Sequence, residues 1–278
     1  MIYTNNLINK VDVKSNITIV TAFFTMKSKF TQDTYKNWMT NFLTLDEYMV
    51  IFTDIHNYEY ISSLRNNSNT FIIVTSIEKF EVAKYMDYWK YCHSIDIENF
   101  RHTVELYMIW NEKTYFVDKA VHLNPFDSQY FFWMDIGCIR DVNLLKYINK
   151  FYVDGIPENK TILSAVTHTI PSNYFNENKI SVSFENRNGL SCVEFNYIQG
   201  GFFGGHKNAI KNWVQMYTDE LSLFIRTKTF GGKDQYIMNN IYLKYSEHLH
   251  IIQPKIFDFI QDPWFSFLIR MNNLSSYL

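Results

Sequence analysis

Two carboxylates occupy positions in this sequence where a side chain could do chemistry. Asp135 lies in the apolar run 130–136, which predicts a central buried strand ending at this residue. Because α/β sheets bind ligands beyond the carboxyl ends of their strands, Asp135 is a candidate ligand-binding residue. Asp234 stands at the start of a predicted helix over 234–245. Each also has a structural interpretation, since Asp135 could cap a helix and Asp234 could interact with a helix dipole.

Glycine clusters are the second feature that suggests a site. Six of the nine glycines lie in two groups: Gly200, Gly201, Gly204 and Gly205, then Gly231 and Gly232. Glycine allows positive φ values and lets a ligand approach the main chain closely, so the clusters predict either tight turns or pocket-lining backbone. Neither group has the spacing of a dinucleotide-binding fingerprint or a phosphate-binding P-loop.

Alternating strands and helices must position these residues. Strands are predicted over 17–24, 48–54, 71–75, 130–136, 161–166, 192–198 and 248–253. Helices are predicted over 31–43, 78–92, 101–123, 207–225 and 234–245, with Thr31 capping the first and Asn124-Pro125 ending the third. The polar segment 171–191 is expected to be a long loop or hairpin. This alternation predicts an α/β fold with a mostly parallel sheet, in one domain because no repeat or linker is visible.

Composition excludes several classes of protein. Aromatic residues make up 18% of the 278 residues, and such a chain is not expected to be disordered. The net charge is -2, and lysines and arginines form no run, which argues against nucleic-acid binding.

The cysteines and the hydropathy pattern bear on the cellular compartment. Cys92, Cys138 and Cys192 are odd in number and widely spaced, so we expect reduced thiols rather than a disulfide framework or zinc site. The N-terminus has no apolar signal-peptide core, and no run approaches the ~20 apolar residues of a membrane span. A cytoplasmic protein without a transmembrane segment is expected.

Four sequence blocks, taken in order, resemble the HtrL/YibB family of GT-A-like glycosyltransferases over about residues 17–253. The most specific block runs from Trp110-Asn111-Glu112-Lys113 through Asn124-Pro125-Phe126 to Phe132-Trp133-Met134-Asp135-Ile136-Gly137-Cys138-Ile139-Arg140. The others are Thr21-Ala22-Phe23-Phe24, Gln199-Gly200-Gly201-Phe202-Phe203-Gly204-Gly205 and Gly232-Lys233-Asp234-Gln235. Order and spacing together make the resemblance specific.

The resemblance implies a single GT-A-like domain over 1–278, with a core at 17–253 and a C-terminal extension at 254–278. It implies transfer of a sugar from a nucleoside-diphosphate donor, UDP being the expected nucleotide, to a hydroxyl of a glycan, glycoprotein or glycolipid. Donor-binding residues would be Thr21, Ala22, Phe23, Asp54, Lys113, Asp135, Gly137, Arg140, Gly200 and Gly201. Asp234 and Gln235 would lie at the catalytic centre, where Asp234 either binds donor-sugar hydroxyls or acts as a base.

The resemblance also implies a metal ligand. Asp135 stands where GT-A enzymes carry the first Asp of a D-x-D motif that holds Mn²⁺ or Mg²⁺, but here the motif reads Asp135-Ile136-Gly137 and lacks the second Asp. A leaving diphosphate still needs positive charge, which a cation on Asp135 or the side chains of Lys113 and Arg140 could supply. Alternatively, Lys113 is a surface residue and Arg140 pairs with a carboxylate such as Asp141.

Other candidate residues keep two interpretations each. Phe202 and Phe203 could stack on a sugar or pack in the core. His206, beside a glycine, could face the pocket. His248 and His250 alternate with apolar residues, which favours histidines at a core edge over metal ligands.

Three functions compete at this level. A glycosyltransferase is favoured by the resemblance. A carbohydrate-binding or scaffold protein that has lost its chemistry is suggested by the missing second Asp. A nucleotidyltransferase is the third, because such enzymes also place a nucleotide on an α/β sheet.

Overall fold

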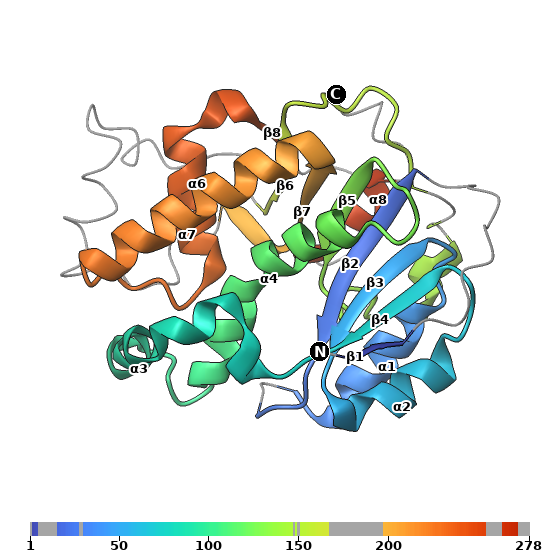
Figure 1. Ribbon diagram of the computed structural model, residues 1–278, viewed down its shortest axis with the longest axis horizontal. Coiled ribbons are helices and arrows are strands. Elements are labelled where there is room, and N and C mark those ends of the chain that lie inside the picture. Colours follow the sequence, from blue (N-terminus) through green and yellow to red (C-terminus); the bar gives the residue numbers. More distant parts are fainter. Residues whose placement is uncertain are drawn as a thin grey trace.

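The computed structural model describes residues 2–4, 16–27, 30–146, 148, 151–166, 197–253 and 263–271. The strands are β1 (Ile2–Thr4), β2 (Ile17–Phe23), β3 (Tyr48–Thr53), β4 (Thr70–Val74), β5 (Tyr130–Met134), β6 (Thr161–Ala165), β7 (Ile198–His206) and β8 (Leu249–Ile252). They join one sheet in the order β1-β4-β3-β2-β5-β7-β6-β8. Figure 1 shows this twisted sheet with helices around it.

The middle of the sheet is parallel and its margins are mixed. Strands β4, β3, β2 and β5 are mutually parallel neighbours. β7 runs antiparallel to both β5 and β6, and β8 is parallel to β6. The carboxyl ends of β2, β3 and β5 therefore meet at one edge of the sheet, where α/β proteins bind ligands. The predicted α/β class with a mostly parallel sheet is confirmed.

Seven α-helices and five short 3-10 helices accompany the sheet in the part of the chain that the structure describes. The α-helices are α1 (Gln32–Leu43), α2 (Ile55–Leu64), α3 (Met86–Ile95), α4 (Val104–Leu123), α6 (Lys207–Arg226), α7 (Asp234–Lys244) and α8 (Phe267–Met271), and the longest 3-10 helix before α3 is η2 (Glu81–Tyr85). The other short 3-10 helices are η1 (Ile77–Lys79), η3 (Val142–Lys146), η6 (Ser246–His248) and η7 (Pro263–Phe265).

Two apolar cores form, one on each face of the sheet. Strand side chains alternate between them: Val50 and Phe52 enter the core under α3, α4, α6 and α7, whereas Met49 and Ile51 enter the core under α1, α2 and α8. In Figure 1, α4 lies beside α6 and α7 on the first of these faces. Burial on both faces explains why these strands are continuous apolar runs in the sequence.

Local signals placed most helix ends correctly. The Thr31 side chain accepts a hydrogen bond from Thr34 N and caps α1, as predicted. Asn124 adopts a left-handed conformation (φ 35°) and ends α4 immediately before Pro125. The predicted helix over 78–92 is instead η1, η2 and the first half of α3.

The largest departure concerns the first glycine cluster, which is not a loop. Gly200, Gly201, Gly204 and Gly205 all belong to strand β7, which fills the space between β5 and β6. Gly204 lies so close to β5 that an added Cβ would stand 2.3 Å from the Phe131 carbonyl oxygen. The predicted segment 171–191 and most of the predicted strand 192–198 lie outside the described residues.

Candidate functional site

Asp135 emerges at the carboxyl end of β5, as its position in the sequence predicted. Its backbone N–H donates to the Gly201 carbonyl at 3.0 Å, which ties it to the start of β7. The Trp133 indole Nε1 donates to Asp135 Oδ1 at 2.8 Å and fixes the carboxylate. Thirty-seven percent of the Asp135 side chain is exposed, so this carboxylate is both held in place and accessible.

Lys113 is the cation of the site. It extends from the buried face of α4, and its Nζ lies 3.1 Å from Asp135 Oδ1 and 3.1 Å from Asp234 Oδ2. The same Nζ donates to the Gly200 carbonyl at 2.8 Å and lies 5.6 Å from the centre of the Trp133 ring. Only 5% of the side chain is exposed, which excludes the surface interpretation of Lys113.

Asp234 is the second, more deeply buried carboxylate. It begins α7, and its Oδ1 accepts a hydrogen bond from Gln235 N at 2.9 Å. Gly200 makes this position possible, because a Cβ there would stand 2.5 Å from Asp234 Oδ1. Only 7% of the Asp234 side chain is exposed, so substrate has far less access to it than to Asp135.

Burial and charge act against each other in this cluster. Burial alone would lower the pKa of Lys113, but the charges of Asp135 and Asp234 outweigh that effect and raise it. Burial raises the pKa of Asp234, and the nearby Lys113 opposes that rise only in part. Lys113 is therefore a charged ammonium at neutral pH.

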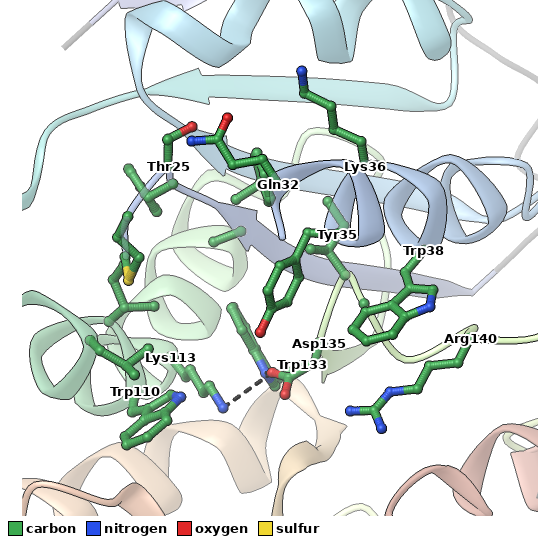
Figure 2. Close-up of a pocket in the computed structure, with 18 of the residues that line it drawn as sticks. Thr25, Gln32, Tyr35, Lys36, Trp38, Trp110, Lys113, Trp133, Asp135 and Arg140 are labelled. Atoms are coloured by element: carbon green, nitrogen blue, oxygen red, sulfur yellow. Dashed lines mark hydrogen bonds and ion pairs between the residues drawn. The ribbon is translucent and has the colours of Figure 1, made fainter. Parts of the chain in front are cut away.

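Two adjoining cavities open around the cluster. The larger, about 430 Å³, has a polar floor of Gln199, Gly200, Gly201, Asp234 and Gln235. The smaller, about 210 Å³, extends along β2 and α1 and is lined by aromatic side chains. Figure 2 shows Tyr35, Trp38 and Trp110 around it, with Lys113 pointing at Asp135. Lys113, Asp135, Arg140, Trp110 and Phe265 line both cavities, which are two halves of one cleft.

Arg140 projects into this cleft over aromatic faces. Its guanidinium carbon lies 4.7 Å from the centre of the Trp38 ring, 4.5 Å from Phe265 and 5.6 Å from Phe30. Stacking of this kind holds a guanidinium at a fixed position beside the cleft.

The other predicted donor-binding residues divide into two groups. Ala22, Phe23 and Gly137 line the aromatic cavity. Thr21 is fully buried and lines neither cavity. Asp54 caps α2, with Oδ1 accepting from His56 N at 2.9 Å and Asn57 N at 3.0 Å, and it too lines neither cavity.

The second glycine pair and the two phenylalanines serve packing. An added Cβ at Gly231 would stand 2.5 Å from the Tyr88 hydroxyl, and one at Gly232 would stand 2.9 Å from the Phe230 ring. Phe202 is fully buried and stacks on Phe132, so the sugar-stacking interpretation is wrong for it. Phe203 is likewise buried, 5.4 Å from the Trp213 ring.

The remaining candidates lie away from the cleft. His206 caps α6, accepting from Asn208 N, and packs on Tyr130. Burial lowers the pKa of His250, a half-buried residue of β8. Cys92 and Cys138 are buried free thiols, as predicted, while Cys192 lies outside the described residues.

One group in the described part of the chain has the residue types and spacing of a metal site: Asp96, Glu98 and His102. Asp96 Oδ2 accepts from the Tyr107 hydroxyl at 2.6 Å and contacts His102 Nδ1 at 2.8 Å, and Oδ1 accepts from Glu98 N at 2.9 Å. Glu98 pairs with Lys233. The ligand atoms already have protein partners, so we interpret the group as a structural network.

Sequence reasoning missed several residues that line the cleft. Leu106, Ile109 and Trp110 line the aromatic cavity on the same helix face as the predicted Lys113, and this helical spacing is the signal that could have identified them. Trp264 and Phe265 close the cleft from a segment that was expected to be an extension outside the core. Gln199 lines the polar cavity, and the sequence predicted no role for it beyond its place in the block that runs from Gln199 to Gly205.

Among the described residues, every helix is too short or too polar to cross a membrane.

Comparison with known proteins finds similar solved structures and one matching sequence family. No curated protein sequence matches the chain. Similar solved structures include one titled PaToxG glycosyltransferase, which is 10% identical with a TM-score of 0.37, the alignment covering 82% of this chain and 69% of that one. Mouse xyloside xylosyltransferase 1 in its apo form is 9% identical with a TM-score of 0.44, covering 90% and 93%. Because both scores lie below 0.5, we base no functional conclusion on them.

The family comparison covers most of the sequence. It matches residues 15–263, which include strands β2 to β8, α4 and every block that carried the resemblance. The chain therefore belongs to the HtrL_YibB family, whose description is a bacterial protein of unknown function.

Proposed function

We propose that this protein is a glycosyltransferase that takes a sugar from a nucleoside-diphosphate donor, with UDP as the nucleotide, and transfers it to an acceptor hydroxyl. The observation that carries the proposal is the Asp135 carboxylate. It is fixed by Trp133 and Lys113, and it is exposed to a cleft at the carboxyl edge of the parallel strands.

The charges of the cleft suit a diphosphate. Four cationic side chains line the two cavities, against two carboxylates: Lys36, Lys113, Arg140 and Lys233 against Asp135 and Asp234. Lys233 is paired with Glu98, so the other three cations exceed the two carboxylates by one, and this positive charge favours a negatively charged nucleoside diphosphate. Arg140 is the best placed of them for a bidentate contact, because stacked rings orient its planar guanidinium.

The aromatic cavity suits a nucleobase or sugar ring. Its lining includes Tyr35, Trp38 and Trp110, with Phe23 at the end of β2. Flat apolar walls with a few polar atoms are typical of sites for ring-shaped ligands. We therefore assign the nucleoside to the aromatic cavity and the sugar with its acceptor to the polar one.

The proposed reaction is a displacement at the anomeric carbon. The oxygen of the acceptor hydroxyl forms a bond to the anomeric carbon. The bond between the anomeric carbon and the diphosphate oxygen breaks, and its electron pair stays on the nucleoside diphosphate. The hydroxyl proton passes to a carboxylate. Asp135 is the carboxylate we assign to this contact, since Asp234 is closed off by Lys113 and the start of α7.

Asp234 and Gln235, the residues predicted at the catalytic centre, take positioning roles in this proposal. Asp234 is the second carboxylate that contacts Lys113 Nζ, at the same distance of 3.1 Å as Asp135. The Gln235 side chain donates to the Ile198 carbonyl at 3.1 Å and connects α7 to the start of β7, next to the polar cavity.

The Mn²⁺ or Mg²⁺ ion implied by the resemblance is a poor match to these residues. Asp135 Oδ1 already contacts Lys113 and Trp133, so one oxygen, Oδ2, is left for an ion. Within the described residues, no His, Cys, Asp or Glu pair joins Asp135 in a metal-binding group. The residues do not fit a resident divalent cation, and we assign no step of the reaction to one.

A binding panel tests the proposal. Thermal unfolding is measured with UDP, GDP, ADP and a set of nucleotide sugars, because a ligand that binds only the folded state raises the Tm. We expect stabilisation by at least one uridine nucleotide and release of free UDP from its sugar derivative. Stabilisation by oligosaccharides but by no nucleotide would contradict the proposal and favour a carbohydrate-binding protein. Pyrophosphate release from a nucleoside triphosphate and a sugar phosphate would instead indicate a nucleotidyltransferase.

A further inference from the structure

We propose that the ammonium of Lys113 takes the place of a divalent cation in this cleft, so that the protein binds its nucleotide ligand without a metal ion. The statement that the nucleotide binds without a metal rests on the function proposed above. The statement about Lys113 rests only on the position and surroundings of that side chain.

Three oxygens surround the Lys113 ammonium. They are Asp135 Oδ1 at 3.1 Å, Asp234 Oδ2 at 3.1 Å and the Gly200 carbonyl oxygen at 2.8 Å. Two carboxylates and a backbone carbonyl are the donor types that a hard divalent cation selects. Here the single positive charge of a lysine side chain offsets part of their combined negative charge, and an ammonium has three N–H groups for the three oxygens.

The chain builds this arrangement from distant segments. Lys113 comes from the buried face of α4, Asp135 from the end of β5 and Asp234 from the start of α7. Gly200 is also required, because any Cβ there would collide with the Asp234 carboxylate. A lysine buried at this depth is costly unless it is paired, and here the pairing is with two carboxylates at once. The ammonium therefore fills the space where an ion would have to enter.

The missing second Asp of the motif agrees with this assignment. Gly137 presents no side chain, and it lies against Trp38 in the aromatic cavity rather than beside Asp135 Oδ1. A divalent ion added beside Lys113 would meet like charge at short range, which disfavours binding.

The experiment measures Mn²⁺ binding by electron paramagnetic resonance in the wild type and in Lys113→Ala. We expect the wild type to bind Mn²⁺ weakly, and the variant to bind one ion at least about tenfold more tightly through the vacated oxygens. Lys113→Gln serves as a second variant in case the alanine variant does not fold. Lys113→Ala combined with Asp135→Asn should lose the gain.

Lys244→Ala is the matched control. Lys244 is also a largely buried lysine, and it pairs with one carboxylate, that of Glu220. It lines neither cavity of the cleft. It should gain no Mn²⁺ binding. Tight Mn²⁺ binding by the wild type that disappears in Asp135→Asn would overturn the proposal.

Nucleotide binding provides an independent test of whether a metal ion is needed. The Tm increase produced by UDP in the wild type should be the same in EDTA and in Mn²⁺. An increase that requires Mn²⁺ would overturn the metal-free assignment while leaving the glycosyltransferase proposal intact. If no nucleotide raises the Tm, the proposed function fails, and the Mn²⁺ measurement still decides the role of Lys113.

A separate observation leads to a second inference, that Gln199 binds a hydroxyl of the transferred sugar. The residue is fully buried and lines the polar cavity, yet its Oε1 and Nε2 atoms have no hydrogen-bond partner among the residues described. A buried amide without partners is costly and is uncommon in native proteins. Its place beside the cleft suggests that a ligand supplies the partner.

The neighbouring glycine leaves room for that ligand. A Cβ at Gly201 would stand 3.1 Å from Gln199 Oε1 and 3.3 Å from Asp135 Oδ2. A side chain at Gly201 would therefore crowd both oxygens, whereas glycine leaves this wall of the cleft open, and a sugar hydroxyl there could donate to either acceptor. Its oxygen could in turn accept from Gln199 Nε2.

Gln199→Leu tests the assignment by separating sugar from nucleotide. We expect its affinity for the nucleotide sugar to fall by about tenfold, while its affinity for free UDP stays unchanged. The Tm of the unliganded variant should rise or stay level, because leucine has no polar atoms to satisfy. The exposed residue Gln215 provides the control, Gln215→Leu. An equal loss for UDP and its sugar derivative, or no loss for either, would contradict the inference.

Discussion

Two clusters of buried charge, both anchored on α4, differ in how completely their oxygens are paired. In the Asp96 cluster, Tyr107 and His102 donate to one carboxylate oxygen and the backbone of Glu98 to the other. In the Lys113 cluster, Asp135 Oδ2 has no hydrogen-bond partner within the described residues, and the side chain is 37% exposed. The first arrangement stabilises the loop between α3 and α4. The second leaves a fixed, accessible carboxylate, which is what a substrate needs.

The comparison also shows that suitable residue types lying close together do not by themselves make a metal site. Asp96, Glu98 and His102 have suitable atoms close together, but those atoms already have hydrogen-bond or ion-pair partners. The Lys113 cluster has only two carboxylates, and a lysine is the cation between them. Whether oxygens are paired distinguishes the two clusters better than which residue types are present.

The largest expected effect is on activity in the open cluster. Asp135→Asn should reduce donor hydrolysis or sugar transfer about a thousandfold, since a carboxylate in contact with the reacting hydroxyl is lost. The variant should stay folded with a lowered Tm, because an amide can still accept from Trp133 Nε1 while Lys113 keeps Asp234 as its one carboxylate partner. The measurement is release of UDP from the donor, with thermal unfolding as the check on folding. Full activity in a folded variant would remove Asp135 from the proposed site.

The next effect is on stability in the closed cluster. Asp96→Ala should lower the free energy of unfolding by about 3 kcal/mol, because a buried tyrosine hydroxyl and a backbone N–H lose their acceptor. Urea unfolding measures the change, and UDP binding under conditions where the variant stays folded should persist. A variant that keeps full stability would show that the cluster is not structural. Mn²⁺-dependent stabilisation of the wild type through Asp96 would show that it binds metal.

The pH dependence of stability separates the clusters further. Burial would raise the pKa of Asp96, but hydrogen bonds from His102 and Tyr107 outweigh it and hold that pKa at about 2. Because the folded-state pKa lies below the unfolded value of about 3.9, the charged form contributes stability above pH 4. That contribution, roughly 2 kcal/mol, should disappear as the pH falls from about 4 to 2. The wild-type and Asp96→Ala unfolding free energies should therefore converge in acid. A constant difference over this range would contradict the pKa direction.

The smallest expected effect concerns Asp54, a residue predicted in the site that the structure places at a helix cap. Asp54→Ala should cost about 1 kcal/mol of stability through loss of the cap on α2. Its affinity for UDP should match that of the wild type. The variant Asp54→Asn, which can still cap, should recover most of the stability. A large loss of nucleotide binding in both variants would instead return Asp54 to the site.

Local sequence signals predicted much of the fold. Strands buried on both faces are apolar runs without periodicity, and β2, β3, β4 and β5 were all found within one or two residues of their observed ends. Strand β7 was missed because it contains four glycines, which are depleted in strands and suggested loops or turns. Its neighbours β5 and β6 require small residues there, and that requirement is visible only after the sheet is assembled.

The sequence predicted only part of the site, because only some of its residues carry a local signal. Asp135 could be placed because strand ends are readable and ligand sites lie at them. Asp54 has the same signal at the end of β3, yet its side chain turns to the N–H groups of α2. Trp264 and Phe265 carry no local sign of function, and they reach the cleft only because the chain returns to it after β8.

The sequence by itself determined the parallel strands β2, β3, β4 and β5, most helix ends, the two informative carboxylates and the family. Those properties depend on hydrophobic pattern, capping residues and motif order, all of which are local along the chain. The tertiary structure decided which charges meet. Lys113, Asp135 and Asp234 are separated by more than a hundred residues at the extremes, and sequence could not show that one ammonium lies within 3.1 Å of both carboxylates. Long-range packing of α4 and α7 against the sheet sets that geometry, because burial makes each charge depend on the partners that the fold supplies.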